Sequence, residues 1–138
     1  MNNIPKEVRK AVYDALNGSI TYNSNAVPIY TVVPRTTQYP YIEISDILLE
    51  NDSAQTEEEG RVTVKLEVVS GFFTDDAGFH VCDDIEEQMT DAMSDLDDQV
   101  KNEMIECIFV QSSYLKDYDG AQILIRRLLT YEVLTQQV

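Results

Sequence analysis

The residues that could form a reactive or metal-binding site are few, and the first of them is a lone histidine. His80 is the only histidine in the chain, and Asp83 and Asp84 follow it closely. Such a group could supply a general base or ligands for a cation. However, one histidine without a second His or Cys ligand at a suitable spacing makes a poor transition-metal site. We therefore interpret His80 as a residue near the start of an acidic helix, and we predict no metal there.

A second candidate is the segment KDYDGAQILIRR, which begins like a calcium-binding loop. Asp117, Asp119 and Gly120 begin a segment similar to the start of an EF-hand loop. The second half of the segment is apolar and basic, whereas the motif requires a glutamate at its twelfth position. Because Asp-Gly between apolar runs is typical of a tight hairpin, the segment predicts a turn between two strands and no bound cofactor.

Nucleophilic catalysis has little support in this sequence. The chain has no GxSxG motif and no glycine-rich phosphate loop, since it contains only five glycines. His80 and Cys82 are two positions apart, and such residues do not share a helix face. Cys82 and Cys107 lack CxxC spacing, and the N-terminus lacks a signal peptide, so we predict two reduced, packed thiols. We expect the protein not to be an enzyme.

Charge is the unusual property of the chain. It has 10 basic and 25 acidic residues and a net charge of −15, which argues against direct nucleic-acid binding and against an anionic membrane surface. Residues 75–106 carry twelve acidic residues and one lysine. Two interpretations remain open. The acidic helix is either a solvated outer face or a field that repels something negative. The acidic residues that would form such a field are Asp83, Asp84, Glu87, Asp91 and Asp95.

Basic residues are few, so their positions are informative. Arg126 and Arg127 are adjacent in a predicted strand and should point to opposite faces. Arg35 and Arg61 lie at a turn and at a strand start. Each arginine could form a local salt bridge or contact an acidic group on another copy of the chain. A second acidic cluster for such contacts consists of Glu57, Glu58 and Glu59.

The hydrophobic pattern predicts two helices and five strands. Ile4, Val8, Val12 and Leu16 recur at helical spacing, and Gly18 is a plausible C-cap. Thr74 is a candidate N-cap for the second helix. The predicted order is helix 4–17, strands 27–33, 41–50 and 61–70, helix 76–96, and two strands within 105–134, with a polar loop or arm at 51–60.

These elements predict one α+β domain over residues 1–138, with an antiparallel or mixed sheet and both helices packed on one face. A chain of 138 residues can form one such core but is short for two domains. No apolar run approaches the ~18 residues of a membrane span, so we expect a soluble protein that stays in the cytoplasm.

One segment contains two prolines that should interrupt regular structure, but it has no catalytic groups. VVPRTTQYPYIEIS, residues 32–45, is called the elbow below. Pro34 should end one strand and Pro40 should shape the start of the next, because proline cannot donate to a sheet ladder. We predict a short structural corner that blunts the sheet edge and presents Arg35, Thr36 and Thr37 to a neighbouring molecule.

The element order and the elbow resemble the tail terminator or tail completion proteins of tailed bacteriophages. These proteins share an "IY-x-x-V-P" segment followed by "P-Y-(V/I)-x-I", and the order of elements agrees along essentially the whole chain. The highly acidic helix departs from the family pattern. The matching residues here are Ile29, Tyr30, Val33, Pro34, Pro40, Tyr41, Ile42 and Ile44.

The resemblance implies a virion subunit that assembles into a ring, commonly six-fold, without any reaction or cofactor. Such a ring caps the tail tube, ends its polymerisation and joins the tail to neck or connector proteins, after assembly in the host cytoplasm. Genome DNA passes through without specific binding, and an anionic lumen would repel its phosphates. The alternative class is an acidic interaction module, such as an adaptor or a DNA-mimicking inhibitor, with a basic partner.

Overall fold

The computed structural model describes residues 4–50, 59–94, 96 and 103–136. Both predicted helices and all five predicted strands are present in the predicted order, and a two-residue strand pair is added after the first helix. The elements are α1 (Ile4–Leu16), β1 (Thr21–Tyr22), β2 (Asn25–Ala26), β3 (Ile29–Tyr30), β4 (Tyr41–Glu50), β5 (Glu59–Phe73), α2 (Ala77–Met93), β6 (Glu103–Asp119) and β7 (Gln122–Gln136).

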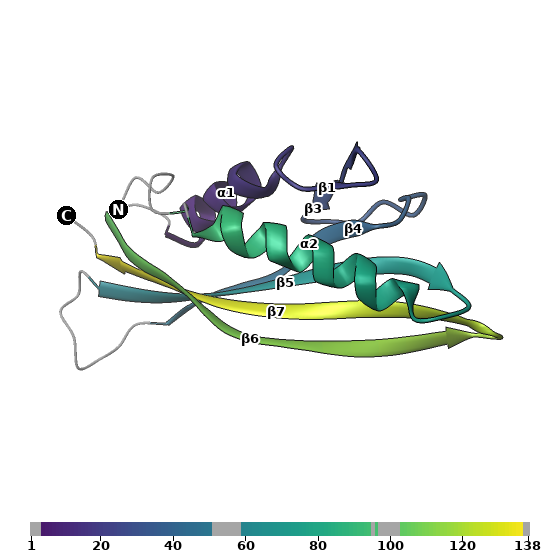
Figure 1. The fold of residues 1–138 in the computed structure, drawn as a ribbon. Helices are drawn as coiled ribbons and strands as arrows, with labels where there is room; N and C mark the ends of the chain where they lie inside the picture. The colour runs from purple at the N-terminus through teal and green to yellow at the C-terminus, as the bar shows by residue number, and fades with distance from the viewer. Residues whose placement is uncertain (1–3, 51–58, 95, 97–102, 137–138) are drawn as a thin grey trace.

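The main sheet has five strands in the order β3-β4-β5-β7-β6. Every neighbouring pair is antiparallel except β3 and β4, which are parallel, so the sheet is mixed. Both helices cover the same face of this sheet, and among the described residues no helix lies against the other face, called the open face below (Figure 1). The prediction of an α+β fold with two helices on one face is therefore confirmed.

The core lies between the helices and the covered face. In β5 the alternation of apolar and polar residues buries Val62, Val64, Leu66 and Val68, as a half-buried strand requires. The predicted helical stripes are buried against them. They consist of Val8, Val12 and Leu16 in α1 and Val81, Ile85, Met89 and Met93 in α2. Tyr131 and its neighbours in β7 complete the core, so the last strand carries a central part of it.

The start of α2 differs from the prediction. The N-cap position is Asp76, without a side-chain capping bond, and the Ala77 N–H donates instead to Asp75 Oδ1 at 3.0 Å. Thr74 is therefore not the cap, because Asp75 lies closer to the first free amide and supplies the oxygen. The helix ends at Met93, slightly before the predicted residue 96. In α1 the predicted glycine stop is consistent with Gly18, whose φ is +79°.

Three strand boundaries also differ. The predicted strand 27–33 is reduced to Ile29–Tyr30, because only these residues pair with β4. β5 begins at Glu59, so the last two residues of the predicted loop 51–60 are in the sheet. Residues 51–58 lie outside the described part of the chain. The hairpin turn lies at Gly120 and Ala121, one position later than expected, since Asp119 pairs with Gln122 and Gly120 has a φ of +62°.

Candidate assembly site

The elbow is a crossover and not the short corner that the two prolines suggested. Because β3 and β4 run parallel, residues 31–40, called the crossover loop below, must carry the chain back before β4 begins. The Thr37 N–H donates to the carbonyl of Pro34 at 3.2 Å, which closes a turn inside the loop. The prolines thus shape the ends of a ten-residue crossover, whose geometry follows from the parallel pairing.

An aromatic cluster fixes the crossover loop against the end of β5. The Tyr39 and Tyr41 rings stack at 5.7 Å, and the Tyr39 and Phe72 rings meet edge to face at 6.1 Å. Gly71 makes this approach possible, since its φ is +97° and a Cβ there would lie 2.9 Å from Tyr39 Cβ. On the same open face, Tyr41 packs with Val69 and Leu124 in a second small apolar cluster.

The crossover loop presents fewer groups than the sequence suggested. Arg35 and Thr36 are exposed, and Val32 is 82% exposed. Thr37 is half-buried, and its hydroxyl oxygen is buried without a hydrogen-bond partner among the described residues. An open hollow of about 1090 Å³ lies between this loop, the β1–β2 turn and the end of β5. The exposed side chains of the loop therefore include the Arg35 cation, the Thr36 hydroxyl and the apolar Val32, beside an open hollow.

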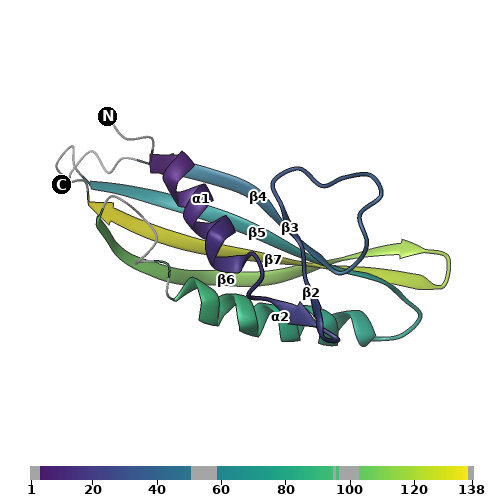
Figure 2. The same ribbon diagram turned by 90° about the horizontal axis from the view of Figure 1, so that it is seen from above.

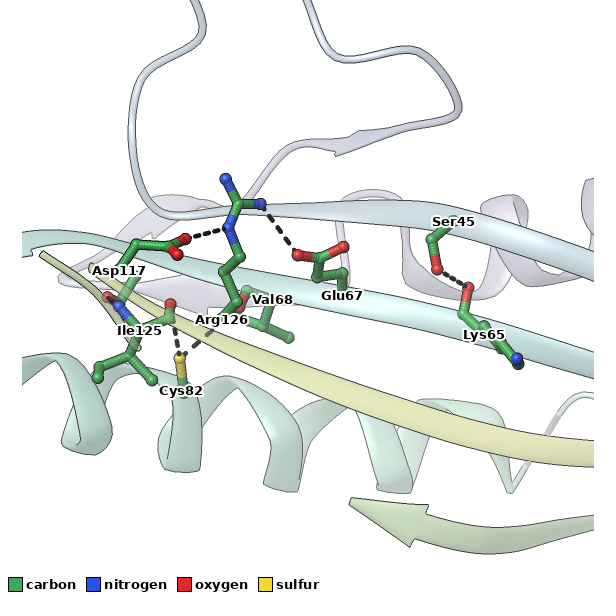
Figure 3. Close-up of polar contacts among 9 residues, drawn as sticks. Ser45, Lys65, Glu67, Val68, Cys82, Asp117, Ile125 and Arg126 are labelled. Carbon is green, nitrogen blue, oxygen red and sulfur yellow. Dashed lines mark hydrogen bonds and ion pairs between the residues drawn. The ribbon is translucent and has the colours of Figure 1, made fainter. Parts of the chain in front are cut away.

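Arg126 is the centre of a polar network on the open face (Figure 3). Its guanidinium donates to Glu67 at 2.9 Å and to Asp117 at 2.8 Å. Burial disfavours the charged form, but these hydrogen bonds outweigh burial and raise the pKa of Arg126. Burial, and then repulsion from the Glu67 carboxylate, raises the pKa of the nearby Glu43 carboxyl. The network thus joins β5, β6 and β7 on a face that no helix covers.

Arg127 points to the opposite face, as predicted for adjacent strand residues. Its guanidinium donates to Glu86 and to Asp83 of α2, each at 2.6 Å. The side chains of Arg127 and Glu86 are only 13% and 18% exposed, whereas Asp83 is 57% exposed. Arg126 and Arg127 therefore both have intramolecular partners, and a contact with another copy remains a prediction for them. Arg61 lies exposed at the start of β5, across from Glu50.

The acidic helix is exposed along one side. Asp84, Glu87 and Asp91 are all exposed, whereas Asp83 is paired with Arg127. Asp95, the fifth acid of the predicted repelling field, lies outside the described residues. Glu57 and Glu58 also lie outside them, and of Glu59 only the backbone, in β5, is described.

The residues that could have supported catalysis are separated. The His80 imidazole is exposed and lies 3.8 Å from Asp76, whereas Cys82 is fully buried with its Sγ 3.8 Å from the carbonyls of Val68 and Ile125 (Figure 3). Burial raises the pKa of the Cys82 thiol to about 12 and that of Cys107 to about 11. Both cysteines are free. These thiols are thus packed residues with little thiolate at neutral pH.

The described residues also bear on metal binding and on membrane insertion. Within those residues, no group of three or more His, Cys, Asp or Glu side chains could hold a metal ion. No described helix has the length and apolar character that a membrane crossing requires. Asp117, the first aspartate of the calcium-like segment, is instead an ion-pair partner of Arg126.

Comparison with solved structures finds the same fold in a virus-like particle. The chain is similar to a chain of the structure described as "Virion of native gene transfer agent (GTA) particle", with a TM-score of 0.71 and 16% sequence identity. The alignment covers 99% of each chain. No protein-family model matches the sequence, and no curated protein matches it. The shared fold therefore extends over the whole domain, although little sequence identity remains.

Proposed function

We propose that this protein is a structural subunit of a phage-like virion, which forms a ring that caps the tail tube and joins the tail to the neck. The observation that carries the proposal is the full-length similarity of fold to a chain of a gene transfer agent virion. The elbow resembles a segment of tail terminator proteins, and this resemblance supports the more specific role at the end of the tail.

The geometry of the described residues suits a structural role. His80 and the two cysteines are not arranged for chemistry, and the polar networks around Arg126 and Arg127 bind elements of the chain to one another. The proposed partners are other copies of the chain, six in a ring by resemblance, together with the tube protein and the neck or connector proteins. Localisation in the virion follows from the same proposal.

The exposed acids of α2 have a role in this proposal. If Asp84, Glu87 and Asp91 face the channel of the ring, their field repels DNA phosphates within a Debye length of ~8 Å at physiological salt. Asp83 contributes less, because Arg127 already neutralises it. Replacing the three exposed acids with Asn or Gln should leave assembly intact and slow DNA passage. Normal genome delivery by these particles would exclude the lumen role for α2.

The crossover loop is the proposed contact with a neighbouring molecule. Arg35→Glu reverses the only charge that this loop presents and should reduce incorporation into particles at least tenfold while the free chain remains folded. Lys65→Glu, at an exposed position of the central strand β5, is a matched charge reversal at another surface. Equal incorporation of the Arg35→Glu variant and the wild type would count against this contact.

The decisive experiment removes the protein from the phage or phage-like element that encodes it. Tail tubes should then lose their uniform length, and heads and tails should accumulate unjoined; both defects should disappear on complementation with the wild-type chain. Gold-labelled copies should lie at the head-proximal end of the tail in electron micrographs. Tails of normal length that join heads without this protein would overturn the proposal.

A further inference from the structure

One edge of the sheet is long, unpaired and rich in exposed apolar side chains. β6 is the outermost strand and has β7 on only one side among the described residues. Half of the large hydrophobic side chains that are exposed in the described chain lie on this one strand. They are Phe109, Val110, Tyr114, Leu115 and Tyr118, which are 44% to 68% exposed. A long bare edge with apolar side chains is a template for pairing with another strand.

The opposite edge is also incomplete. β3 pairs with β4 only at Ile42 and Glu43, so the segment Ser45–Glu50 of β4 has no strand beyond it within the described residues. Leu48 projects from this segment on the open face and is 48% exposed. Leu115 projects from β6 on the same open face, since it pairs with Arg126, and it is 54% exposed. Each edge thus carries a half-exposed leucine on the face that no helix covers.

The two edges differ in charge in the helical layer, since α2 is strongly acidic and α1 has three cations and two acids. α2 runs along the β6 side of the molecule and α1 along the β4 side (Figure 2). α2 contains five acids and no Lys or Arg. In contrast, Lys6 and Arg9 of α1 line a hollow with Ser45, Asp46 and Ile47 of the bare β4 segment. The β6 side is therefore acidic, and the β4 side has cations next to its unpaired strand.

We infer that β6 of one copy pairs with the Ser45–Glu50 segment of β4 in a second copy, so that neighbouring subunits share one continuous sheet. The occupant of the β6 edge is thus another copy of this chain, joined head to tail. Pairing of β6 with β6 across a two-fold axis is disfavoured, because it would place two acidic α2 helices on the same side of the joined sheet. The head-to-tail arrangement instead sets acidic α2 beside basic α1.

A head-to-tail contact uses two different surfaces. A growing row of subunits therefore always has a free β6 edge at one end and a free β4 edge at the other, and these two ends can pair to close a ring. This inference deepens the proposed function, and it rests on the proposal that copies of the chain assemble with one another. It names the surfaces between subunits, which the resemblance to tail terminators does not.

The test uses two variants that each block one edge. Val110→Lys with Leu115→Lys charges the β6 edge, and Leu48→Lys charges the β4 edge; lysine is a residue with which natural edge strands prevent pairing. Thr63→Lys is the matched control, because it places the same charge on the open face of a central strand. Circular dichroism and thermal unfolding verify that each variant is folded.

Sedimentation velocity of the full chain gives the expected results. The wild type and Thr63→Lys should form oligomers at micromolar concentrations, and each edge variant alone should be a monomer. An equimolar mixture of the two edge variants should form heterodimers and nothing larger, because one intact edge of each kind remains.

Three outcomes would overturn the inference. They are a wild type that stays monomeric, oligomers of the β6-edge variant, or a Leu48→Lys variant that still forms dimers, as β6–β6 pairing would give. The particle assay of the proposed function separates the two ideas. If edge variants still form rings that cap tail tubes, only the inference is refuted. If the wild type forms rings through these edges that never cap tubes, only the proposed function is refuted.

Discussion

The two faces of the central sheet are stabilised by different interactions. The covered face buries aliphatic side chains such as Val64 and Leu66 against both helices, and its core is almost entirely apolar. Among the described residues, the open face has the small cluster of Tyr41, Val69 and Leu124 together with the Arg126 network. Stability therefore depends mainly on one face, which leaves the other face free to carry polar groups and contacts.

The largest effect should come from an aliphatic residue of the covered face. Leu66→Ala removes a side chain that is 1% exposed and should cost about 2–5 kcal/mol of unfolding free energy. Leu48→Ala on the open face, at 48% exposure, should cost less than about 1 kcal/mol. Denaturant unfolding measures both values, and equal losses would contradict the difference between the faces.

The two arginines sharpen this comparison, because for charged groups the two faces should behave alike. Arg127→Met leaves the Glu86 carboxylate, 18% exposed, without its partner under α2 and should cost about 2–3 kcal/mol. Arg126→Met also leaves a poorly exposed carboxylate without its partner, since Glu67 is only 15% exposed, and should likewise cost about 2–3 kcal/mol; Asp117, which is 53% exposed, is solvated by water and adds little. Thermal unfolding at neutral pH compares them. Adding Glu86→Gln to Arg127→Met should recover part of the lost stability, because it removes the unpaired carboxylate. If stability is not recovered, the loss comes from the packing of the Arg127 side chain.

A pair of glycines tests how the crossover loop is attached to the open face. Gly71→Ala places a Cβ on a residue with positive φ and against the Tyr39 side chain. We therefore expect the free energy of unfolding to fall by about 2 kcal/mol. Gly120→Ala has a positive φ but nothing within 4 Å, so backbone strain alone should cost about 1 kcal/mol. Urea midpoints give the difference. If both substitutions cost the same, the loop is not held by its contact with Gly71.

The smallest effect concerns pH. The pKa of Glu43 is raised in the folded protein by burial and then by Glu67, so folding favours the protonated carboxyl. Its contribution to stability is complete below the ordinary value of 4.5 and is lost as pH rises through the higher folded pKa. Glu43→Gln should therefore stabilise the protein by a few tenths of a kcal/mol at pH 7 and not at pH 4. If Glu43→Gln stabilised the protein at pH 4 and not at pH 7, the expected pH dependence would be contradicted.

The covered face could be predicted from the sequence because its signals are periodic and local. Val62, Val64, Leu66 and Val68 alternate, and the stripe of α2 recurs at helical spacing, so both elements and their buried sides follow directly. The opposite directions of Arg126 and Arg127 follow from the same strand geometry. These predictions needed no knowledge of which strands are neighbours.

The open face could not be predicted, because its contacts join distant residues. Nothing local shows that Glu67 and Arg126 meet, or that Gly71 lies beneath Tyr39. The elbow was interpreted as a short corner because its prolines mark strand ends but not the relative direction of the strands. The parallel pairing of β3 and β4 depends on the whole sheet, and so does the position of β6 at its edge.

The position of β7 between β5 and β6 has a consequence for synthesis on the ribosome. β7 is the last strand to be translated, yet it supplies Leu129, Tyr131 and Val133 to the core and pairs with β5 over most of its length. A nascent chain that ends before this strand has an unpaired β5 edge and an unfilled core. The domain therefore cannot complete its fold during translation of β1 to β6, and polysomes that bring incomplete chains together expose their β5 edges to one another.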